Sequence, residues 1–292
     1  MSLQYSYYPG CASHSTAKEY DTSIKAVSKV FDITLDEIPD WVCCGASPAH
    51  SSNELLSEAL PAKNMELALF KKLPVATSCA ACYSRLRLAN HEIKTNVNLK
   101  NRLNSELKIS YNGELEIKHF LDILYKDVGL ENIKSKLKKG LNGLKVASYY
   151  GCLLTRPKEP VGFDDVENPV SMDKIIETLG GESVKWGYKT ECCGASLAIS
   201  RPDLVIKLAN DILSHAKKMG TECIVTACPL CQPNLDSRQK EIRDQFNEDY
   251  NMPVFYFSQL VGLALGVPTT DLMFERLITE PYTLLKSKNL LN

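Results

Sequence analysis

The sequence predicts an α/β protein built from two duplicated, pseudo-symmetric halves, each a small, mostly parallel sheet flanked by helices. Two observations predict this fold: a cysteine pattern that occurs twice, and short apolar runs that alternate with amphipathic helices. The length of 292 residues, with 44% hydrophobic and 24% charged residues, suits two domains of ordinary size. We place the boundary in the lysine- and glycine-rich segment 131–143, which gives a first half of 1–140 and a second half of 141–292.

Each half opens with a strand-like run, LQYSYY at residues 3–8 and KVASYY at residues 145–150. A helix follows in each, with apolar residues on one face at helical spacing: Tyr20, Ile24, Val27 and Phe31 in the first half; Met172, Ile175, Ile176 and Leu179 in the second. The later elements recur in the same order: helices at 53–73 and 201–220, strands at 74–78 and 222–227, and strand-to-helix segments at 117–124 and 254–261. This alternation predicts parallel strands with helices on both faces.

Three segments depart from the repeat. The segment 131–143 shows no apolar face of its own, which is why we place the boundary there. Residues 153–170 contain an excess of about eight residues in a loop rich in proline and aspartate, and residues 90–118 are about twelve residues longer than their counterpart.

Ten of the eleven cysteines form two sets with the same internal order, C-x31-CC-x34-C-x2-C and C-x39-CC-x34-C-x2-C. The first set is Cys11, Cys43, Cys44, Cys79 and Cys82, and the second is Cys152, Cys192, Cys193, Cys228 and Cys231. Disulfide frameworks belong to small secreted chains, so this pattern favours metal ligation. Because loops at the carboxyl ends of parallel strands gather at one edge of a sheet, we expect each set to converge there, near the domain interface.

Five thiolates in one set point to a multinuclear centre. A zinc site or an ordinary cubane cluster uses four ligands, which leaves one cysteine over. Adjacent cysteines point in divergent directions and are expected to bind different metal atoms. Gly10, Gly45, Gly151 and Gly194 flank the ligands; they either let the backbone approach a cluster closely or only make turns.

Over essentially its whole length the chain resembles the HdrB family of heterodisulfide reductase proteins from methanogenic archaea, which consist of CCG cysteine-rich modules. The resemblance rests on both five-cysteine sets, the repeated CCGAS, and the pairing of YYPGC with YYGC. It implies two non-cubane [4Fe-4S] clusters, held by the first and second cysteine sets, and reduction of the coenzyme M–coenzyme B disulfide during methanogenesis. It also implies the iron-sulfur protein HdrC and the flavin-bearing protein HdrA as partners, with hydrogenase or formate dehydrogenase upstream.

Five further residues are candidates for the chemistry around the clusters. His14 and His50 lie near the first cysteine set and are candidate proton donors to a leaving thiolate, or ordinary loop histidines. Lys18, Arg156 and Arg201 are candidates for binding the anionic ends of the substrate, or solvated surface cations. The eleventh cysteine, Cys223, lies inside a predicted strand and is expected to be a buried apolar residue.

The charge and composition of the chain argue against several other classes of protein. With 34 basic and 35 acidic residues, no global charge favours nucleic acid or a membrane surface. No apolar run approaches the roughly 18 to 20 residues of a membrane-spanning helix, and no signal peptide is visible, so we expect a cytoplasmic protein. Neither GxGxxG nor GxxxxGK[ST] occurs, so no flavin or nucleotide is expected in this chain.

Two other functions remain open from the sequence. The chain could be an iron-sulfur electron-transfer subunit of a hydroxyacid or succinate dehydrogenase complex, for which a co-purifying flavoprotein would argue. It could also be a structural zinc-binding protein, which zinc in place of iron and sulfide would favour.

Overall fold

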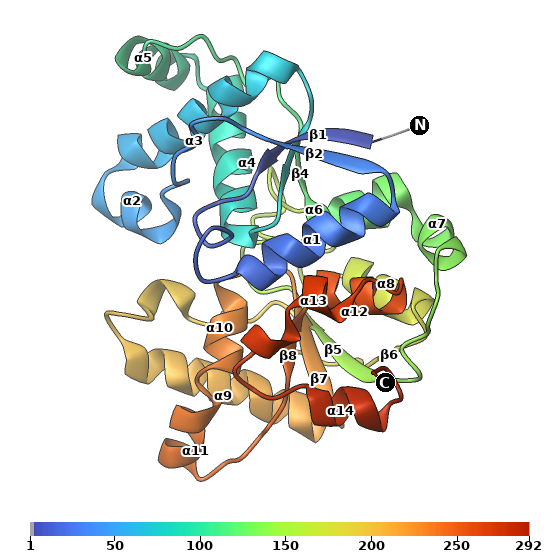
Figure 1. Cartoon of the computed structure of the whole chain (residues 1–292). Helices are drawn as coiled ribbons and strands as arrows, with labels where there is room; N and C mark the ends of the chain where they lie inside the picture. The colour runs from blue at the N-terminus through green and yellow to red at the C-terminus, as the bar shows by residue number, and fades with distance from the viewer. Residues whose placement is uncertain (1–2, 292) are drawn as a thin grey trace.

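The computed structural model describes residues 3–291 and folds them into two four-stranded sheets, one above the other in Figure 1. The first sheet has the order β2-β1-β3-β4, and the second repeats it as β6-β5-β7-β8. The strands are β1 Leu3–Tyr8, β2 Ile33–Glu37, β3 Val75–Thr77, β4 Ile117–His119, β5 Lys145–Tyr149, β6 Glu182–Ser183, β7 Cys223–Thr226 and β8 Val254–Tyr256. Every pairing among these strands is parallel, so the predicted duplicated α/β fold is confirmed.

Helices connect the strands and cover the sheets in both halves. The first half contains α1 Lys18–Val30, α2 Ala46–Ser52, α3 Glu54–Ala68, α4 Ala80–Thr95, α5 Val97–Leu107, α6 Phe120–Asp122 and α7 Leu130–Ser135, with a 3-10 turn at Leu69–Lys71 and a π-helical segment at Ile123–Val128. The second half contains α8 Ser171–Thr178, α9 Pro202–Lys218, α10 Cys231–Asp236, α11 Gln239–Phe246, α12 Phe257–Ala264, α13 Thr269–Leu272 and α14 Tyr282–Ser287, with 3-10 turns at Ala195–Leu197 and Phe274–Arg276.

The apolar faces predicted for α1 and α8 are the faces that the protein buries. Tyr20, Ile24 and Val27 of α1 are fully buried, and so are Met172 and its three apolar companions on and after α8. The extra length of residues 90–118 forms the end of α4 and a separate helix, α5, which the sequence pattern did not assign. Asn96 caps α5 by accepting a hydrogen bond from the backbone N–H of Leu99.

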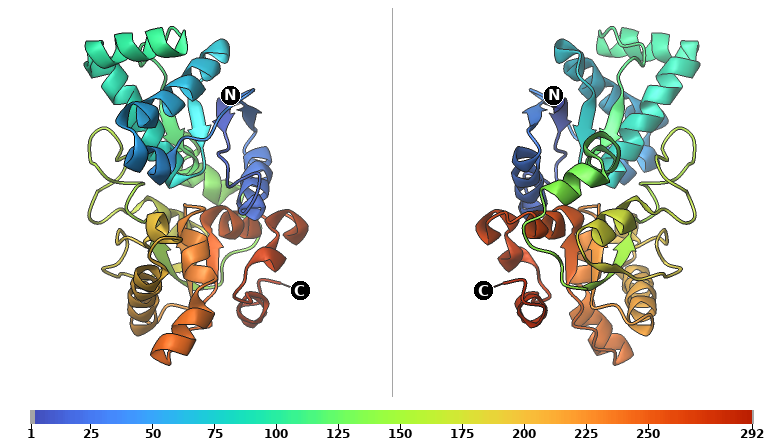
Figure 2. Two further views of the ribbon diagram at one scale, coloured as in Figure 1. Left: turned by 90° about the vertical axis from the view of Figure 1, so that its left-hand side faces the viewer. Right: turned by 90° about the vertical axis from the view of Figure 1, so that its right-hand side faces the viewer.

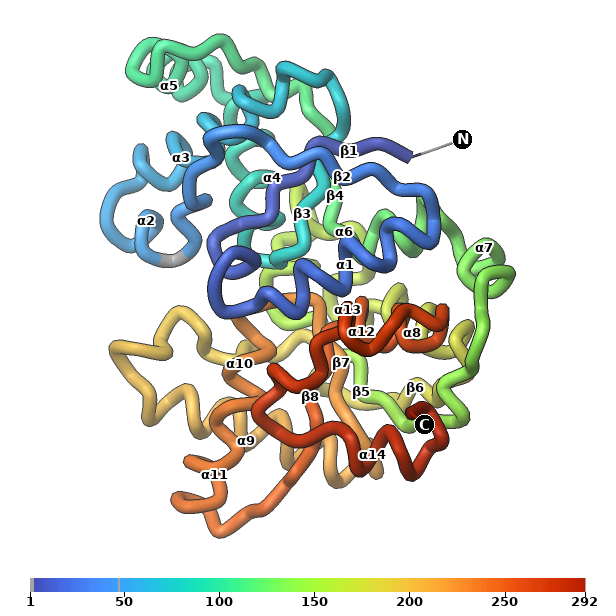
Figure 3. Tube along the Cα trace, in the orientation of Figure 1, coloured from blue at the N-terminus to red at the C-terminus, as the bar shows by residue number. Residues whose placement is uncertain are grey.

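The segment 131–143 is more structured than the sequence suggested. It continues α7, and Ile133 and Leu141 are both fully buried, so the expectation that it lacks an apolar contact surface is wrong. The backbone N–H groups of Lys138 and Lys139 both donate to the carbonyl of Ala264. Beyond α7 the chain runs along one side of the molecule to β5, as Figure 3 shows. Two buried anchors and these hydrogen bonds hold the connection against the second half.

Helix α1 forms the main contact between the halves. It packs against α12 and α13, which lie beside it in both views of Figure 2. The ring of Tyr20 stacks on that of Tyr256 with centroids 4.1 Å apart, and Ser23 Oγ lies 2.7 Å from Ser258 Oγ. These contacts are buried, so they fix the orientation of the two halves.

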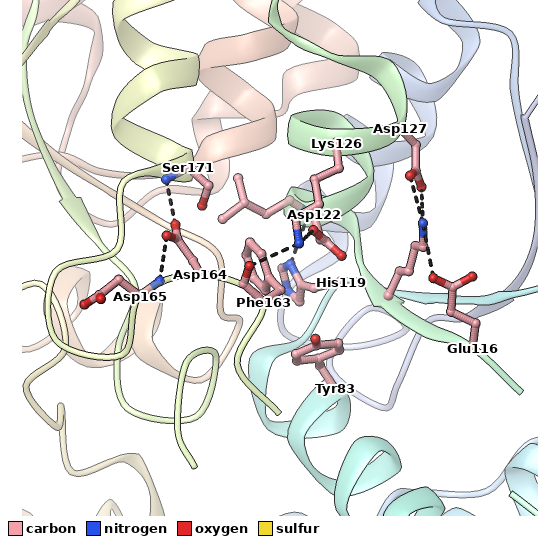
Figure 4. A network of polar contacts seen from close by, with 12 residues as sticks. Tyr83, Glu116, His119, Asp122, Lys126, Asp127, Phe163, Asp164, Asp165 and Ser171 are labelled. Carbon is pink, nitrogen blue, oxygen red and sulfur yellow. Dashed lines mark hydrogen bonds and ion pairs between the residues drawn. The ribbon is translucent and has the colours of Figure 1, made fainter. Parts of the chain in front are cut away.

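The inserted loop 153–170 of the second half crosses to the first half. Three first-half side chains donate hydrogen bonds to its carbonyls: Tyr83 Oη to Val161 at 2.8 Å, Arg87 Nε to Pro160 at 2.8 Å, and Lys126 Nζ to Phe163 at 3.1 Å. Figure 4 shows Lys126 reaching Phe163, and Asp164 accepting from the backbone N–H of Ser171 at the start of α8. The loop is therefore tied to both halves.

Candidate metal centres

The first cysteine set gathers at the carboxyl ends of its strands. Cys11 follows β1, the Cys43-Cys44 pair follows β2, and Cys79 caps α4 directly after β3. The Sγ atoms of Cys44 and Cys82 are 3.3 Å apart, and Cys44 and then Cys79 raise the pKa of the Cys82 thiol. The fold thus brings together residues that are far apart in sequence.

The second set repeats this arrangement. The Sγ atoms of Cys193 and Cys231 are 3.3 Å apart, as are their first-half counterparts, and Cys228 bonds to Cys231. Cys192 pairs with Cys152, so here the adjacent cysteines diverge as expected. In the first set the Cys43 thiol is close enough to Cys44 for that neighbour to raise its pKa, while Cys44 Sγ lies 3.3 Å from Cys82 Sγ.

The tyrosine of the repeated Y-x-G-C pattern, Tyr8 in one half and Tyr149 in the other, has a structural role in both halves. Tyr8 donates its hydroxyl hydrogen to the carbonyl of Val42 at 2.8 Å, and Tyr149 donates to the carbonyl of Glu191 at 2.7 Å. Each acceptor immediately precedes a Cys-Cys pair. The tyrosines therefore join the loop after the first strand to the loop that carries the adjacent cysteines.

Gly10 and Gly151 allow close backbone approach to a thiol. Both have positive φ, +74° and +69°. A Cβ at Gly10 would lie 3.0 Å from Cys82 Sγ, and one at Gly151 would lie 3.1 Å from Cys231 Sγ. Of the two alternatives for these glycines, the structure supports close approach as well as a turn.

The two sets meet in the middle of the molecule. Cys79 of the first set and Cys228 of the second are close enough for each thiol to shift the pKa of the other, and both side chains are buried. The contact lowers the pKa of Cys228, after the larger effect of its hydrogen bond with Cys231. Hydrogen bonds from Cys43 and then Cys82 lower the pKa of the Cys44 thiol to about 3. The same contacts raise the pKa of the partner thiols Cys82 and Cys231, so neighbouring thiols of a set share protons instead of all ionising together.

The donor set is that of a sulfur-ligated multinuclear centre. No three His, Cys, Asp or Glu side chains among the described residues are grouped to hold a single metal ion, and the thiols occur instead as neighbouring pairs. Iron-sulfur clusters take thiolate ligands on separate iron atoms, so paired thiols supplied by five cysteines fit such a group.

A cavity of about 280 Å³ opens between the halves at the second set. All five second-set cysteines line it: Cys152, Cys192, Cys193, Cys228 and Cys231. The first half closes the opposite wall with His50, Ser51, Ala80, Ala81 and Arg85. The site of the second set is therefore completed by residues of the first half.

The candidate residues of the sequence are not all at this cavity. His50 lines it. His14 is exposed and lies 3.1 Å from Glu37, Lys18 is exposed at the start of α1, and neither is part of the cavity wall. Arg156 pairs with Glu167 at 2.8 Å, and Arg201 pairs with Asp203 at 2.8 Å on the surface.

The cation that does line the cavity is Arg85, which the sequence did not single out. It lies on α4, three residues after Cys82, and so about one helical turn beyond a ligand. This spacing from a cysteine is the sequence feature that could have identified Arg85 as a candidate. Cys223 is fully buried in β7, and burial raises the pKa of its thiol, as expected for an apolar role.

His119 connects the two C-x-x-C loops. Its Nε2 lies 2.8 Å from the carbonyl of Ser78, the backbone of Ala227 also bonds to it, and Nδ1 accepts from the N–H of Leu121. The imidazole is fully buried, and burial lowers its pKa to about 4. It is therefore neutral, with the proton on Nε2, at physiological pH.

This burial predicts a loss of stability in mild acid. The unfolded chain has a histidine pKa near 6.5, so below that pH it binds a proton that the folded state excludes. Stability from His119 is present above pH 6.5 and is lost as the pH falls toward 4, by about 2 kcal/mol between pH 7 and pH 5. Denaturant unfolding of the wild type and of His119→Gln at both pH values tests this. An equal pH dependence in the two proteins would contradict the prediction.

Comparison with known proteins identifies the repeat. The CCG cysteine-rich domain matches residues 5–87 and again residues 146–236. The first match includes all five cysteines of the first set, and the second includes all five of the second set. The chain belongs to the CCG cysteine-rich domain family. The resemblance expected from the sequence is therefore confirmed.

Two relatives of this CCG protein are named as subunits of reductases. The 8-methylmenaquinol:fumarate reductase membrane anchor subunit of Wolinella succinogenes is 37% identical, over 93% of this chain and 95% of that protein. The B subunit of the ferredoxin:CoB-CoM heterodisulfide reductase of Methanosarcina mazei is 33% identical, over 93% of this chain and 92% of that protein. Within residues 3–291, no helix combines the length and apolar character needed to cross a membrane.

A solved structure shares the fold of this CCG protein. A hypothetical protein from Helicobacter pylori superposes with a TM-score of 0.75 over 95% of the chain, at 13% sequence identity. The chain spans about half the length of that protein, 52%. At this identity the match supports the two-sheet architecture alone.

Proposed function

We propose that this chain is the catalytic iron-sulfur subunit of a CoB-CoM heterodisulfide reductase. The observation that carries the proposal is the occurrence of two equivalent five-cysteine sets, each with a thiol pair 3.3 Å apart, beside a cavity that residues of both halves line. The 33% identity with the Methanosarcina mazei heterodisulfide reductase protein, over 93% of the chain, supports the same function. A disulfide contains two sulfur atoms, and two adjoining redox sites suit a substrate of that kind.

The ten cysteines would hold two non-cubane [4Fe-4S] clusters, one per half. Such clusters supply electrons to a bound disulfide. The reaction takes up two electrons and two protons, breaks the S–S bond, and releases coenzyme M and coenzyme B as thiols. His50 lies in the cavity wall with the second-set cysteines and is the candidate to deliver a proton to a departing thiolate.

Electrons would reach the clusters from partner proteins. The sequence contains no flavin or nucleotide fingerprint, so the proposed donors are the iron-sulfur protein HdrC and the flavin-bearing protein HdrA, with hydrogenase or formate dehydrogenase upstream. We propose that the complex works in the cytoplasm. The boundary between the two halves would lie near residue 140, between α7 and β5.

A second candidate is an electron-transfer subunit of a fumarate- or succinate-linked complex. The 37% identity with the Wolinella succinogenes fumarate reductase protein favours it. In that case the two clusters would relay electrons to a flavoprotein and no disulfide would be reduced.

Metal analysis and two assays on protein purified without oxygen test the proposal. We expect about eight irons with matching acid-labile sulfide per chain, and little zinc. The CoB-CoM heterodisulfide should oxidise a reduced viologen dye in the presence of the protein. Iron and sulfide without this activity, together with a co-purifying flavoprotein that reduces fumarate, would support the second candidate; zinc without sulfide would contradict both.

A further inference from the structure

Arg85 is placed to act across the boundary between the halves. It lies on α4 of the first half, yet it lines the cavity that all five second-set cysteines surround. Its Nε is buried and has no hydrogen-bond partner among the described residues. A buried guanidinium N–H without a partner is costly, so the position favours a ligand that can accept its hydrogen bonds.

The equivalent position of the second half is occupied differently. Asn234 lies 149 residues later, the same offset that relates the two C-x-x-C motifs. Its Nδ2 donates to the carbonyl of Cys193 at 3.2 Å and approaches Cys193 Sγ at 3.7 Å. The second half thus uses a neutral side chain that is committed to its own cysteine loop. The first half instead presents a cation to the shared cavity.

Two of the other cations considered above, Arg156 and Arg201, have partners elsewhere. Arg156 bonds to Glu167 and to Thr190 Oγ1, and Arg201 forms two hydrogen bonds with Asp203. Among the described residues that line the cavity, Arg85 is the one arginine or lysine. On its other side lies a hollow that contains Glu58 and Glu92. Burial raises the pKa of the Glu58 carboxyl and the charge of Arg85 lowers it, but among the described side chains no ion pair includes Arg85.

A guanidinium is well suited to bind an oxyanion, because its planar fork can donate two parallel hydrogen bonds to a sulfonate, phosphate or carboxylate. We propose that Arg85 of the first half binds the anionic group of a thiol or disulfide whose sulfur enters the cavity of the second half. The inference deepens the proposed function, on which it rests, by naming the residue that selects an anionic ligand. It also makes the two cysteine sites inequivalent.

Binding of two small thiols that differ in charge tests the inference. The protein, loaded with its clusters and free of oxygen, is titrated calorimetrically with 2-mercaptoethanesulfonate and with 2-mercaptoethanol. We expect Arg85→Gln to weaken binding of the sulfonate by about 10- to 100-fold, as for loss of a charged hydrogen bond, and to leave the neutral thiol unchanged. Arg85→Lys keeps the charge without the fork and should give a smaller loss.

Arg243 on the exposed face of α11 provides the matched control, because it lies outside the cavity wall. Arg243→Gln should leave both affinities unchanged. The ratio of the two affinities is the deciding quantity, and iron content shows whether each variant assembles. If Arg85→Gln fails to retain iron, the ratio is read from Arg85→Lys. A ratio equal to that of the wild type would overturn the inference.

Heterodisulfide turnover, measured on the same preparations, separates this inference from the proposed function. Binding of the sulfonate that depends on Arg85, without turnover of the heterodisulfide, would support the anion site and overturn the proposed reaction. Turnover that Arg85→Gln leaves unchanged, with an unchanged affinity ratio, would support the reaction and overturn the role of Arg85.

Discussion

Replacing Cys193 with alanine is expected to remove about half of the iron and acid-labile sulfide from the protein, from about eight atoms of each to about four. Cys193 is buried, its thiol lies 3.3 Å from that of Cys231, and it lines the cavity of the second set. Its loss would leave an incomplete ligand set in the second half and an intact one in the first. Iron and sulfide analysis after anaerobic purification measures the effect.

Three further variants test whether iron is lost because a cluster ligand is missing. Cys44 occupies the equivalent position of the first half, with its thiol 3.3 Å from Cys82, so Cys44→Ala should remove the other half of the iron. The double variant should retain almost none. Cys223→Ala, also a change of a buried cysteine, should keep the full content. Iron loss in Cys223→Ala equal to that in Cys193→Ala would show that the effect is structural.

The second large effect is expected at the glycine of the first CCG motif. Gly45 has a φ of +80°, and a Cβ there would lie 2.6 Å from Ala49 Cβ and 3.0 Å from Leu60 Cδ1. Gly45→Ala combines a left-handed backbone with overpacking, and should lower the free energy of unfolding by about 2 to 4 kcal/mol. Denaturant unfolding followed by circular dichroism measures this difference.

A substitution at Gly143 separates the cost of the left-handed backbone from the cost of overpacking. It also has positive φ, +67°, but a Cβ there would meet nothing within 4 Å. Gly143→Ala should therefore lower the free energy of unfolding by only the backbone contribution of about 1 to 2 kcal/mol. Equal effects of the two substitutions would show that the space around Gly45 adjusts, and would refute the packing argument.

The sequence predicts the fold well because the same pattern of apolar residues and cysteines occurs twice. The predicted apolar faces and strands have counterparts about 140 to 150 residues further along the chain, so chance patterns are easily rejected. Parallel strands then require the cysteine loops to meet at one edge. The joining of those loops by Tyr8 and Tyr149 is visible only as a repeated pair of letters until the hydrogen bonds are known.

The wall of the cavity could not be predicted in the same way. His14, Lys18 and Arg201 lie close to cysteines in sequence, but nearness along the chain does not set the direction of a side chain on a loop or helix end. Arg85 belongs to the second site only because the two halves pack across α1, α12 and the inserted loop. Contacts between the two halves depend on how the halves are oriented relative to each other. The repeated sequence pattern describes each half separately and does not specify that orientation.

The inserted loop 153–170 has a consequence for folding. Its carbonyls are held by Tyr83, Arg87 and Lys126, while its end caps α8, so neither half can unfold without breaking contacts made by the other. Separation would also expose the stacked rings of Tyr20 and Tyr256 to water. We therefore expect the duplicated halves to unfold as one cooperative unit, although each has its own sheet.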